Sequence, residues 1–485
     1  MNESSQLVVA ALASIAVIVV LITALKVHPV IALFVGSLTV GVVAWQDLNE
    51  LVISFSTGFG TTMAGVGLLV GLGAMFGKLL FDSGGADEIV DTLVNRSSRR
   101  MLPWTMAGVG ALIGLPMFFE IGLVLLVPVI FLVARRAQMP LMSVGIPTLA
   151  GLSVMHGFVP PHPGPLVAID NLNADLGITL ALGVVLAIPT VIVAGPLFAP
   201  FAARWVPVPA PDFFEVGSRA ESRSGGGSAR GAAGGSGGSG AAADSVEPAE
   251  DESRTRTPSG RQPAFGITVA TVLLPVVLML GKAFADVVAP DSTSWTKAAL
   301  DFLGTPLIAL LAAVMLAMFS LCRPAGMGKN EIATSLHESL PPIAGVILIV
   351  GAGGGFKQVL IDTGIGDVIT DFAQDSGISV LVLGWLVAVL VRLATGSATV
   401  ATVTASGIMA PLVESLDLGT GETSLLVLAI GAGSLIFSHV NDAGFWLIKE
   451  LFEIEVVENI KTWSVMETII SVVGLVLVLI AGIFV

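Results

Sequence analysis

Residues 156–165 read HGFVPPHPGP and follow directly on the apolar run GIPTLAGLSVM at 145–155. Four prolines in ten residues predict a break in the helix, because each proline lacks a backbone N–H and collides with the preceding turn. A second apolar run breaks at 438–444, which reads SHVNDAG. Unwound backbone at membrane depth is tolerated only where it is buried or lines a wet cavity. Two such breaks indicate the binding site of a membrane transporter.

The composition indicates an all-α polytopic membrane protein. Of the 485 residues, 54% are hydrophobic and 12% are charged, and much of the apolar content lies in blocks of about 20 residues, the length that crosses a bilayer as a helix. The single cysteine, Cys322, excludes an intrachain disulfide framework, and no Cys/His spacing points to a metal site. The net charge of −14 excludes a protein that reads nucleic acid.

A segment of different composition divides the chain. Residues 210–262 are rich in Gly, Ser and Ala, carry many charges and contain almost no large apolar side chains. Such a segment cannot bury enough surface to fold. We therefore expect a first transmembrane repeat at 1–205, a disordered linker at 206–262 and a second transmembrane repeat at 263–485.

The two halves are similar in sequence. GLGAMFGKLLFDSGGADEIVD from Gly71 aligns with GAGGGFKQVLIDTGIGDVITD from Gly351, an offset of 280 positions. The two breaks also correspond, with His156 matching His439. Internal duplication of this kind is the usual architecture of secondary transporters.

The loop charges predict that the repeats are inverted. Basic loop residues of the first half are Arg96, Arg99, Arg100, Arg135 and Arg136, whereas the corresponding loops of the second half carry Asp367, Asp371, Asp375, Glu414, Asp417 and Glu422. Short loops rich in Lys and Arg stay cytoplasmic. Corresponding loops are therefore expected on opposite sides, with the N-terminus external and the linker cytoplasmic.

Each repeat is expected to contain about five transmembrane helices, one of them broken, and one re-entrant hairpin. Residues 103–134 lie between two loops predicted on the same side, and two full crossings would need about 40 residues. This segment is therefore predicted to form a hairpin, with a counterpart at 379–413. The other spans are predicted at 7–25, 28–45, 64–81, 142–172 (broken), 178–203, 265–288, 304–322, 341–361, 425–452 (broken) and 464–485.

The tip of the second hairpin has the composition of an anion site. It reads TGSAT at 395–399 and lies close to Arg392. Helix N-termini at the midplane attract anions, and small side chains let a ligand approach, although small residues also serve tight helix packing. Arg392 could hold a carboxylate bidentately or clamp hairpin carbonyls. We predict substrate contacts from Arg392, Thr395, Gly396, Ser397 and Thr399.

Titratable side chains at the breaks and in the first hairpin are candidates for proton coupling. Glu120 lies between apolar runs, where desolvation keeps a carboxyl protonated, unless it serves as a structural carboxyl bonded to the hairpin backbone. Histidine changes charge near neutral pH. For Asp442, capping of the helix expected to start at Gly444 is the stronger single prediction. We assign proton coupling to Glu120, His156 and Asp442, and further substrate contacts to His162, Ser438, His439 and Asn441.

Several long motifs are similar to those of one transporter family. LSVMHGFVPPHPGP, FFEIGLVLLVPVIF, RLATGSATVAT and IFSHVNDAGFWLIKE followed by KTWSVMETIISVVGL resemble the gluconate:proton symporter family, across nearly the whole chain except the linker. The resemblance implies proton-coupled uptake of an aldonate such as gluconate, on the ion-transporter superfamily fold of paired hairpins and broken helices. Family members also carry other hydroxylated acids, including D-serine. Ala443 departs from the VNDPGFW form expected there.

The expected function is secondary transport in the inner membrane, in contact with lipid. A small carboxylate would be the substrate and protons the coupling ions, with no cofactor and with homo-oligomer formation left open. Sodium coupling is the first alternative, since hairpin tips rich in Ser and Thr also coordinate Na⁺. A membrane enzyme is disfavoured because no nucleophile with a base at fixed spacing appears. A passive channel usually lacks two inverted halves that meet at broken helices.

Overall fold

The computed structural model describes residues 3–209, 261–289, 292–365, 378–416 and 418–484. These ranges are helical and contain no strand. Seven helices are long and apolar enough to cross a membrane, or eight if one bent pair is a single span. The predicted all-α, polytopic class is confirmed. The predicted linker at 206–262 lies almost entirely outside the described residues, as do Asp367, Asp371 and Asp375.

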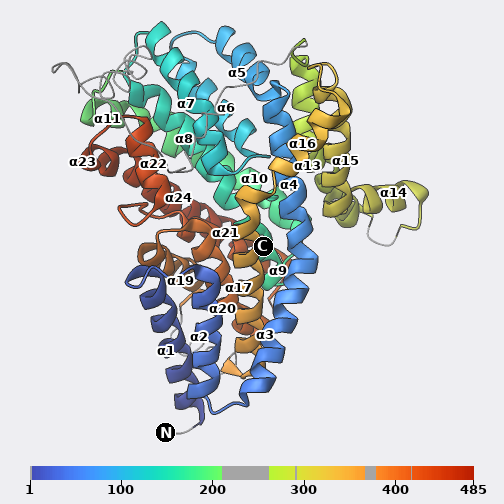
Figure 1. Ribbon diagram of the computed structural model, residues 1–485, viewed down its shortest axis with the longest axis vertical. Helices are drawn as coiled ribbons and strands as arrows, with labels where there is room; N and C mark the ends of the chain where they lie inside the picture. Colours follow the sequence, from blue (N-terminus) through green and yellow to red (C-terminus); the bar gives the residue numbers. More distant parts are fainter. Residues whose placement is uncertain (1–2, 210–260, 290–291, 366–377, 417, 485) are drawn as a thin grey trace, which may run out of the picture.

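The elements of the two halves correspond broadly in order, although α14 has no counterpart between α1 and α2 (Figure 1). The first half contains α1 (Glu3–Thr23), α2 (Pro29–Val43), α3 (Leu48–Thr62), α4 (Leu68–Asp82), α5 (Gly85–Asn95), α6 (Leu102–Gly114), α7 (Phe119–Arg136), α8 (Leu141–Phe158), α9 (Pro163–Asn171), α10 (Leu176–Ile192) and α11 (Ala199–Trp205). The second half contains α13 (Phe265–Val288), α14 (Trp295–Leu303), α15 (Pro306–Ala317), α16 (Lys329–Glu338), α17 (Ala344–Asp362), α19 (Val380–Thr395), α20 (Ala398–Leu416), α21 (Thr420–Ser434), α22 (Ala443–Leu451), α23 (Val456–Asn459) and α24 (Val465–Ala481).

Two helices are much longer than predicted. The span expected at 64–81 is the second part of a continuous helix, Leu48–Asp82, in which a π-helical turn joins α3 to α4. The span expected at 341–361 likewise belongs to Lys329–Asp362. In the first case, residues 46–63 were left between two predicted spans. Asp47 in fact caps α3, because its carboxylate accepts a hydrogen bond from the N–H of Asn49 at 2.7 Å.

Helices α5, α14 and α23 lie outside every predicted span and hairpin. Residues Trp295–Leu303 form α14, which meets the span Pro306–Cys322 at 74°. The sequence analysis predicted only that span, at 304–322. The segment is polar enough to look like a loop, because apolar side chains occupy only one side of α14.

The long helices α3 and α17 pack closely and run antiparallel. A Cβ on Gly355 would lie 2.7 Å from the ring of Phe55, and a Cβ on Gly351 would lie 2.6 Å from the ring of Phe59. Contact positions rise along α3 as they fall along α17, which fixes the antiparallel direction. Absence of side chains at these positions is what lets the two backbones approach.

A matched pair of contacts links the halves. Ser335 of α16 donates to Asp82 of α4 at 2.6 Å, and Ser54 of α3 donates to Asp362 of α17. Asp362 follows Asp82 by 280 positions, and Ser335 follows Ser54 by 281. The same contact is thus made twice with the roles of the halves exchanged, which supports the predicted repeat. The inverted orientation of the two repeats in the membrane stays a prediction.

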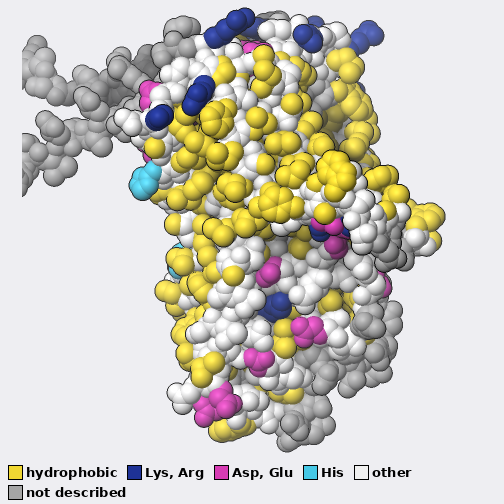
Figure 2. All heavy atoms as spheres, turned by 90° about the vertical axis from the view of Figure 1, so that its right-hand side faces the viewer, with side chains coloured by type: hydrophobic (Ala, Val, Ile, Leu, Met, Phe, Trp, Pro, Cys, Tyr) yellow, Lys and Arg dark blue, Asp and Glu magenta, His cyan; other side chains and the backbone are white. Residues whose placement is uncertain are grey.

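Charge is distributed unevenly along the long axis. Figure 2 shows Lys and Arg side chains gathered at the upper end of the molecule, whereas Asp and Glu lie mostly in the lower half. The N-terminus lies at the lower end (Figure 1). Under the rule that short basic loops stay cytoplasmic, the upper end is the expected cytoplasmic end.

Candidate functional site

Both predicted hairpins are present as pairs of helices joined by short turns, and both predicted breaks are present with corrected bounds. That the hairpins are re-entrant stays a prediction, since Ala398–Leu416 is itself long and apolar enough to cross a membrane. Helices α6 and α7 are joined at 115–118, and α19 and α20 at 396–397. The first break, predicted at 156–165, spans only 159–162, because Pro163 opens α9 at a position where a missing N–H costs nothing. His156 therefore lies in the last turn of α8. The second break, predicted at 438–444, is longer and spans 435–442.

Each break holds the hairpin of its own repeat through a side chain. Nε2 of His162 lies 2.6 Å from the carbonyl oxygen of Gly114, at the end of α6. The amide of Asn441 donates to the carbonyls of Leu393 and Ala394, at the end of α19, at 3.0 and 3.3 Å. The last carbonyls of a helix have no partner within the helix, so these side chains complete the hairpin ends. His162 and Asn441 thus do the same task in the two halves.

The hairpin tips meet the second break at a cavity of about 250 Å³. It is lined by Phe119, Glu120, Ser153, His156, Arg392, Thr395, Gly396, Ser397, Ala398, Thr399, Leu435, Asn441, Asp442, Ala443, Gly444, Trp463 and Glu467. Most of the predicted site residues are in this set. The structure therefore brings together groups that lie more than 300 positions apart in the sequence, such as Glu120 and Asp442.

The electrostatic centre of the cavity is the pair Arg392–Asp442. Nη2 of Arg392 lies 2.5 Å from Oδ2 of Asp442, and the two side chains are 4% and 13% exposed. Ser438 donates to the same carboxylate oxygen. The other oxygen of Asp442 accepts the N–H of Gly444 at 2.8 Å and so caps α22, which confirms the predicted cap. Arg392 is held by a protein carboxylate in this conformation.

Three helix N-termini open onto the cavity. They belong to α7 at Phe119, α20 at Ala398 and α22 at Ala443. The first N–H groups of a helix lack partners within the helix and carry the positive end of its dipole. Their convergence, beside the guanidinium of Arg392, favours an anion or another strong acceptor.

Four buried polar atoms of the cavity lining have no hydrogen-bond partner among the residues that the structure describes. They are Nε of Arg392, Nδ1 of His156, Oδ1 of Asn441 and Oε1 of Glu467. Buried polar groups are nearly always paired, and exceptions call for a ligand, an ion or water. Donors and acceptors both occur in this set, as a hydroxylated ligand requires.

Three predicted substrate contacts lie behind the cavity lining. His162 is occupied with Gly114. The hydroxyl of Ser438 accepts the indole N–H of Trp463 at 2.7 Å, and Nε2 of His439 lies 3.3 Å from the carbonyl oxygen of Leu393. In this conformation the three side chains brace the hairpins and the second break.

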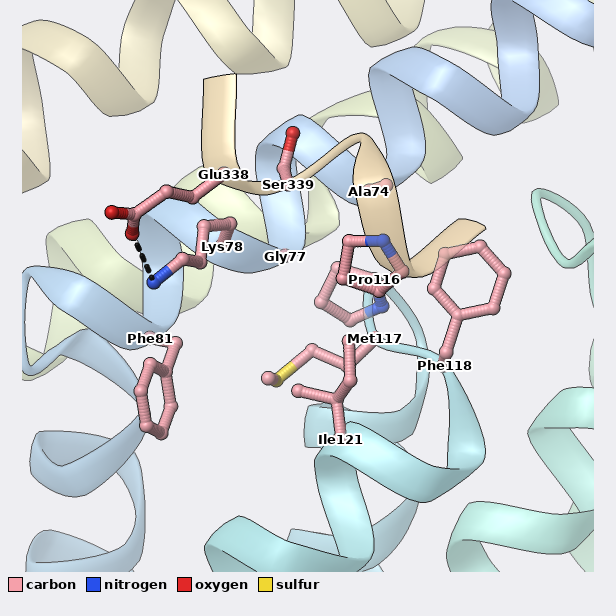
Figure 3. A pocket seen from close by; sticks show the side chains of 11 residues that line it. Ala74, Gly77, Lys78, Phe81, Pro116, Met117, Phe118, Ile121, Glu338 and Ser339 are labelled. Carbon is pink, nitrogen blue, oxygen red and sulfur yellow. Dashed lines mark ion pairs between the residues drawn. The ribbon is translucent and has the colours of Figure 1, made fainter. Parts of the chain in front are cut away.

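A smaller cavity of about 210 Å³ lies between α4 and the tip of the hairpin α6/α7. Figure 3 shows Ala74 and Gly77 on one side and Pro116 and Met117 on the other. The amine of Lys78 lies 3.5 Å from the carboxylate of Glu338 at its edge.

The corresponding region of the second half is packed. A Cβ on Gly353 of α17 would lie 1.9 Å from Val403 of α20. A Cβ on the matching Gly73 of α4 would come no nearer to any described residue than 4.0 Å, at Pro161. The two hairpins therefore dock differently on their long helices.

Comparison with known proteins identifies the family. The model of the GntP family permease matches residues 6–224 and 240–484. The chain belongs to the GntP permease family. A gluconate permease of Pseudomonas aeruginosa is 44% identical over 99% of this chain and 98% of that protein. A high-affinity gluconate transporter of Escherichia coli is 39% identical over 93% of each chain, and the Gnt-II system L-idonate transporter of the same organism is 36% identical over 96% of each.

The fold of this GntP family permease is also found in a solved structure. The YdaH transporter of Alcanivorax borkumensis, whose crystal structure revealed an unusual topology, matches with a TM-score of 0.58 over 90% of each chain at 16% identity. At that identity the similarity concerns the fold. Together with the family, it establishes a multi-pass membrane transport protein, and the family is not one of enzymes.

Part of the cavity lining of this GntP family permease was not predicted from the sequence. Glu467, Ser153 and Trp463 were not predicted as site residues. A signal for Glu467 was present, because it is a carboxyl inside the apolar run that forms α24, the same pattern that singled out Glu120. Ser153 and Trp463 carry no comparable signal and are recognised only from the cavity.

Proposed function

We propose that this permease imports gluconate or a closely related sugar acid, together with protons, across the cytoplasmic membrane. The observation that carries the proposal is the cavity at the hairpin tips, where three helix N-termini and one guanidinium converge. The names of the relatives, which include gluconate and L-idonate transporters, support the choice of a sugar acid.

The lining suggests how such a substrate would be held. Its carboxylate would lie against the amides of Ala398 and Thr399 at the start of α20, within reach of Nε of Arg392. Its hydroxyls would pair with Oδ1 of Asn441 and Nδ1 of His156, which have no other partner among the described residues. Ser397 and Thr395 add hydroxyl groups at the tip.

Charge balance favours proton coupling. The cavity holds three carboxyl groups, Glu120, Asp442 and Glu467, against the guanidinium of Arg392. An entering anion would add a further negative charge in a confined space of low dielectric constant, where unpaired charge is costly. Uptake of a proton with the anion removes that cost.

Sodium coupling is the rival within this proposal. The described residues contain no group of three or more His, Cys, Asp or Glu side chains arranged to hold a metal ion. A sodium site built from carbonyl and hydroxyl oxygens at the hairpin tips would need no such group. An experiment is therefore required to distinguish sodium coupling from proton coupling.

The test is uptake by the purified full-length protein in proteoliposomes. With an inward proton gradient and no sodium, labelled gluconate should accumulate, and L-idonate should compete more strongly than D-serine. Accumulation that requires a sodium gradient and persists when the pH gradient is collapsed would overturn the assignment of protons as the coupling ion. Failure to transport any sugar acid or hydroxy acid under either gradient would overturn the function.

The orientation belongs to the same proposal. The basic upper end would face the cytoplasm, with the linker at 206–262 on that side, and the two repeats would be inverted with respect to each other. Membrane lipid is the expected partner of the apolar surface.

A further inference from the structure

We propose that Glu467 is the proton-binding site of this transporter and that one proton crosses on its carboxyl with each substrate anion. This inference rests on the proposed function and goes beyond it, because it names the group that carries the coupling ion and fixes the stoichiometry.

Glu467 occupies a sheltered part of the cavity wall. It lies on α24 and is 1% exposed. Ser153 of α8 lines the cavity with it, and Oε1 has no hydrogen-bond partner among the described residues. The rings of Phe119 and Trp463, 5.3 Å apart, form an apolar part of the same lining. The carboxyl therefore has little access to bulk water and one oxygen free to bear a proton.

The other carboxyls of the cavity are less suited to carry the proton. Asp442 accepts from Arg392, Ser438 and the N–H of Gly444, so its negative charge is compensated. Glu120 is exposed and lies in the first turn of α7, where water and the helix dipole stabilise the anion. Glu467 alone among the three is buried without a cation in direct contact, as judged from the described residues.

The charged and titratable groups around Glu467 come from several elements. Arg392 of α19 and Asp442 at the start of α22 are close enough to interact with it electrostatically. His156 of α8 and Glu120 of α7 line the same cavity. The packed elements α10 and α21 add no charge near it, because Glu422 lies at the far end of α21. Lys461, one turn before α24, is exposed.

The transport step is balanced in charge. With the cavity open to the outside, Glu467 takes a proton from water as the substrate carboxylate binds near Arg392. After the change of conformation, the substrate leaves and Glu467 returns its proton to water on the inside. One monovalent anion and one proton then cross together, so the cycle moves no net charge and responds to a pH gradient but not to membrane potential.

The test replaces the carboxyl with an amide. Glu467→Gln keeps the size and a hydrogen-bonding group but cannot release a proton. In proteoliposomes it should lose at least 10-fold in gluconate accumulation driven by a pH gradient, while gluconate exchange, with substrate on both sides and no gradient, should stay within about threefold of wild type. The matched control is Glu422→Gln, at an exposed carboxyl at the start of α21, which should behave as wild type in both assays.

Two further measurements make the outcome decisive. Gluconate binding to the wild-type protein in weakly buffered detergent should take up one proton per protein, and binding to Glu467→Gln should take up none. Normal pH-driven accumulation by Glu467→Gln would overturn the proposal. So would loss of exchange in both Glu467→Gln and Glu467→Asp, because it would mark the carboxyl as structural. Failure of wild type to transport any sugar acid would instead overturn the proposed function.

Discussion

At the scale of single residues, Arg392 makes a contact that neither alternative from the sequence included. Its guanidinium is paired with Asp442, which fixes the second hairpin to the start of α22, and its Nε remains unpaired toward the cavity. Breaking a buried ion pair leaves one charge uncompensated and costs about 3–5 kcal/mol. The pair therefore stabilises the site, while the remaining donor is available to a substrate carboxylate.

Gly396, at the tip of the second hairpin, offers a sharp test of this geometry. It has a φ of +75°, and a Cβ there would lie 2.3 Å from the carbonyl oxygen of Asn441. We expect Gly396→Ala to reduce gluconate uptake at least 10-fold and to lower the melting temperature of the purified protein, because both the left-handed conformation and the contact with the break are disturbed.

The matched control for that substitution is Gly364→Ala. Gly364 has a φ of +73°, but a Cβ there would meet no atom of the described residues within 4 Å. This variant should lose only about 1 kcal/mol of stability from the backbone conformation and should keep its uptake. Equal loss of uptake in the two variants would contradict a specific role for the contact between the tip and Asn441.

At the scale of elements, the two hairpins are built alike but docked differently. His162 and Asn441 hold the hairpin ends in the same way, yet the hairpin α19/α20 is packed on α17 at Gly353 while the matching contact at Gly73 of α4 is open. If the two halves exchange their docking during transport, the alternative conformation closes the smaller cavity beside α4.

Filling that smaller cavity should therefore hold the protein in the conformation described here, because the cavity could no longer close. Ala74→Trp places a large ring between α4 and the tip of the hairpin α6/α7. We expect gluconate binding within about threefold of wild type and transport reduced at least 10-fold. The control is Leu68→Trp, on the exposed face of the same helix, where Leu68 is 60% exposed. Normal transport by Ala74→Trp would show that the cavity does not need to close.

The sequence predicted the elements unequally well. The hairpins were predicted because loop charges and segment length together exclude two full crossings, and the breaks because proline and short polar runs are read directly. The beginning of α3 was not predicted, because Asp47, which caps the helix, is a residue type that is also common in loops. Glu467 showed a signal as a carboxyl within an apolar run, but only the fold brings α24 to the hairpin tips and so reveals its place in the cavity. Likewise, nothing local to His162 reveals that it faces Gly114.

At the scale of the whole molecule, the uneven charge predicts its orientation. Asn49 lies near the acidic lower end and Ser98 in the basic loop before α6, and both are exposed. The single native cysteine, Cys322, is buried. An impermeant thiol reagent added to intact cells should label Asn49→Cys and should label Ser98→Cys only after the cells are opened.

Labelling of Ser98→Cys in intact cells would contradict the orientation. Labelling of both positions from one side would also contradict it, since α3 and α4 form one continuous helix between these two regions. The unsubstituted protein, in which Cys322 is buried, gives the background level of thiol labelling.

The length of that continuous helix has a mechanical consequence. Its 35 residues extend about 52 Å, whereas the hydrocarbon layer of a bilayer is about 30 Å thick. A helix of this length that lies along the bilayer normal extends beyond the hydrocarbon layer. It must therefore either tilt or project into water. Its partner Lys329–Asp362 is nearly as long, and the two pack closely where glycines bring them together. We therefore expect the tilt of these two long helices to depend on bilayer thickness. Because the hairpins pack on α4 and α17, a change in that tilt would change the space available to them.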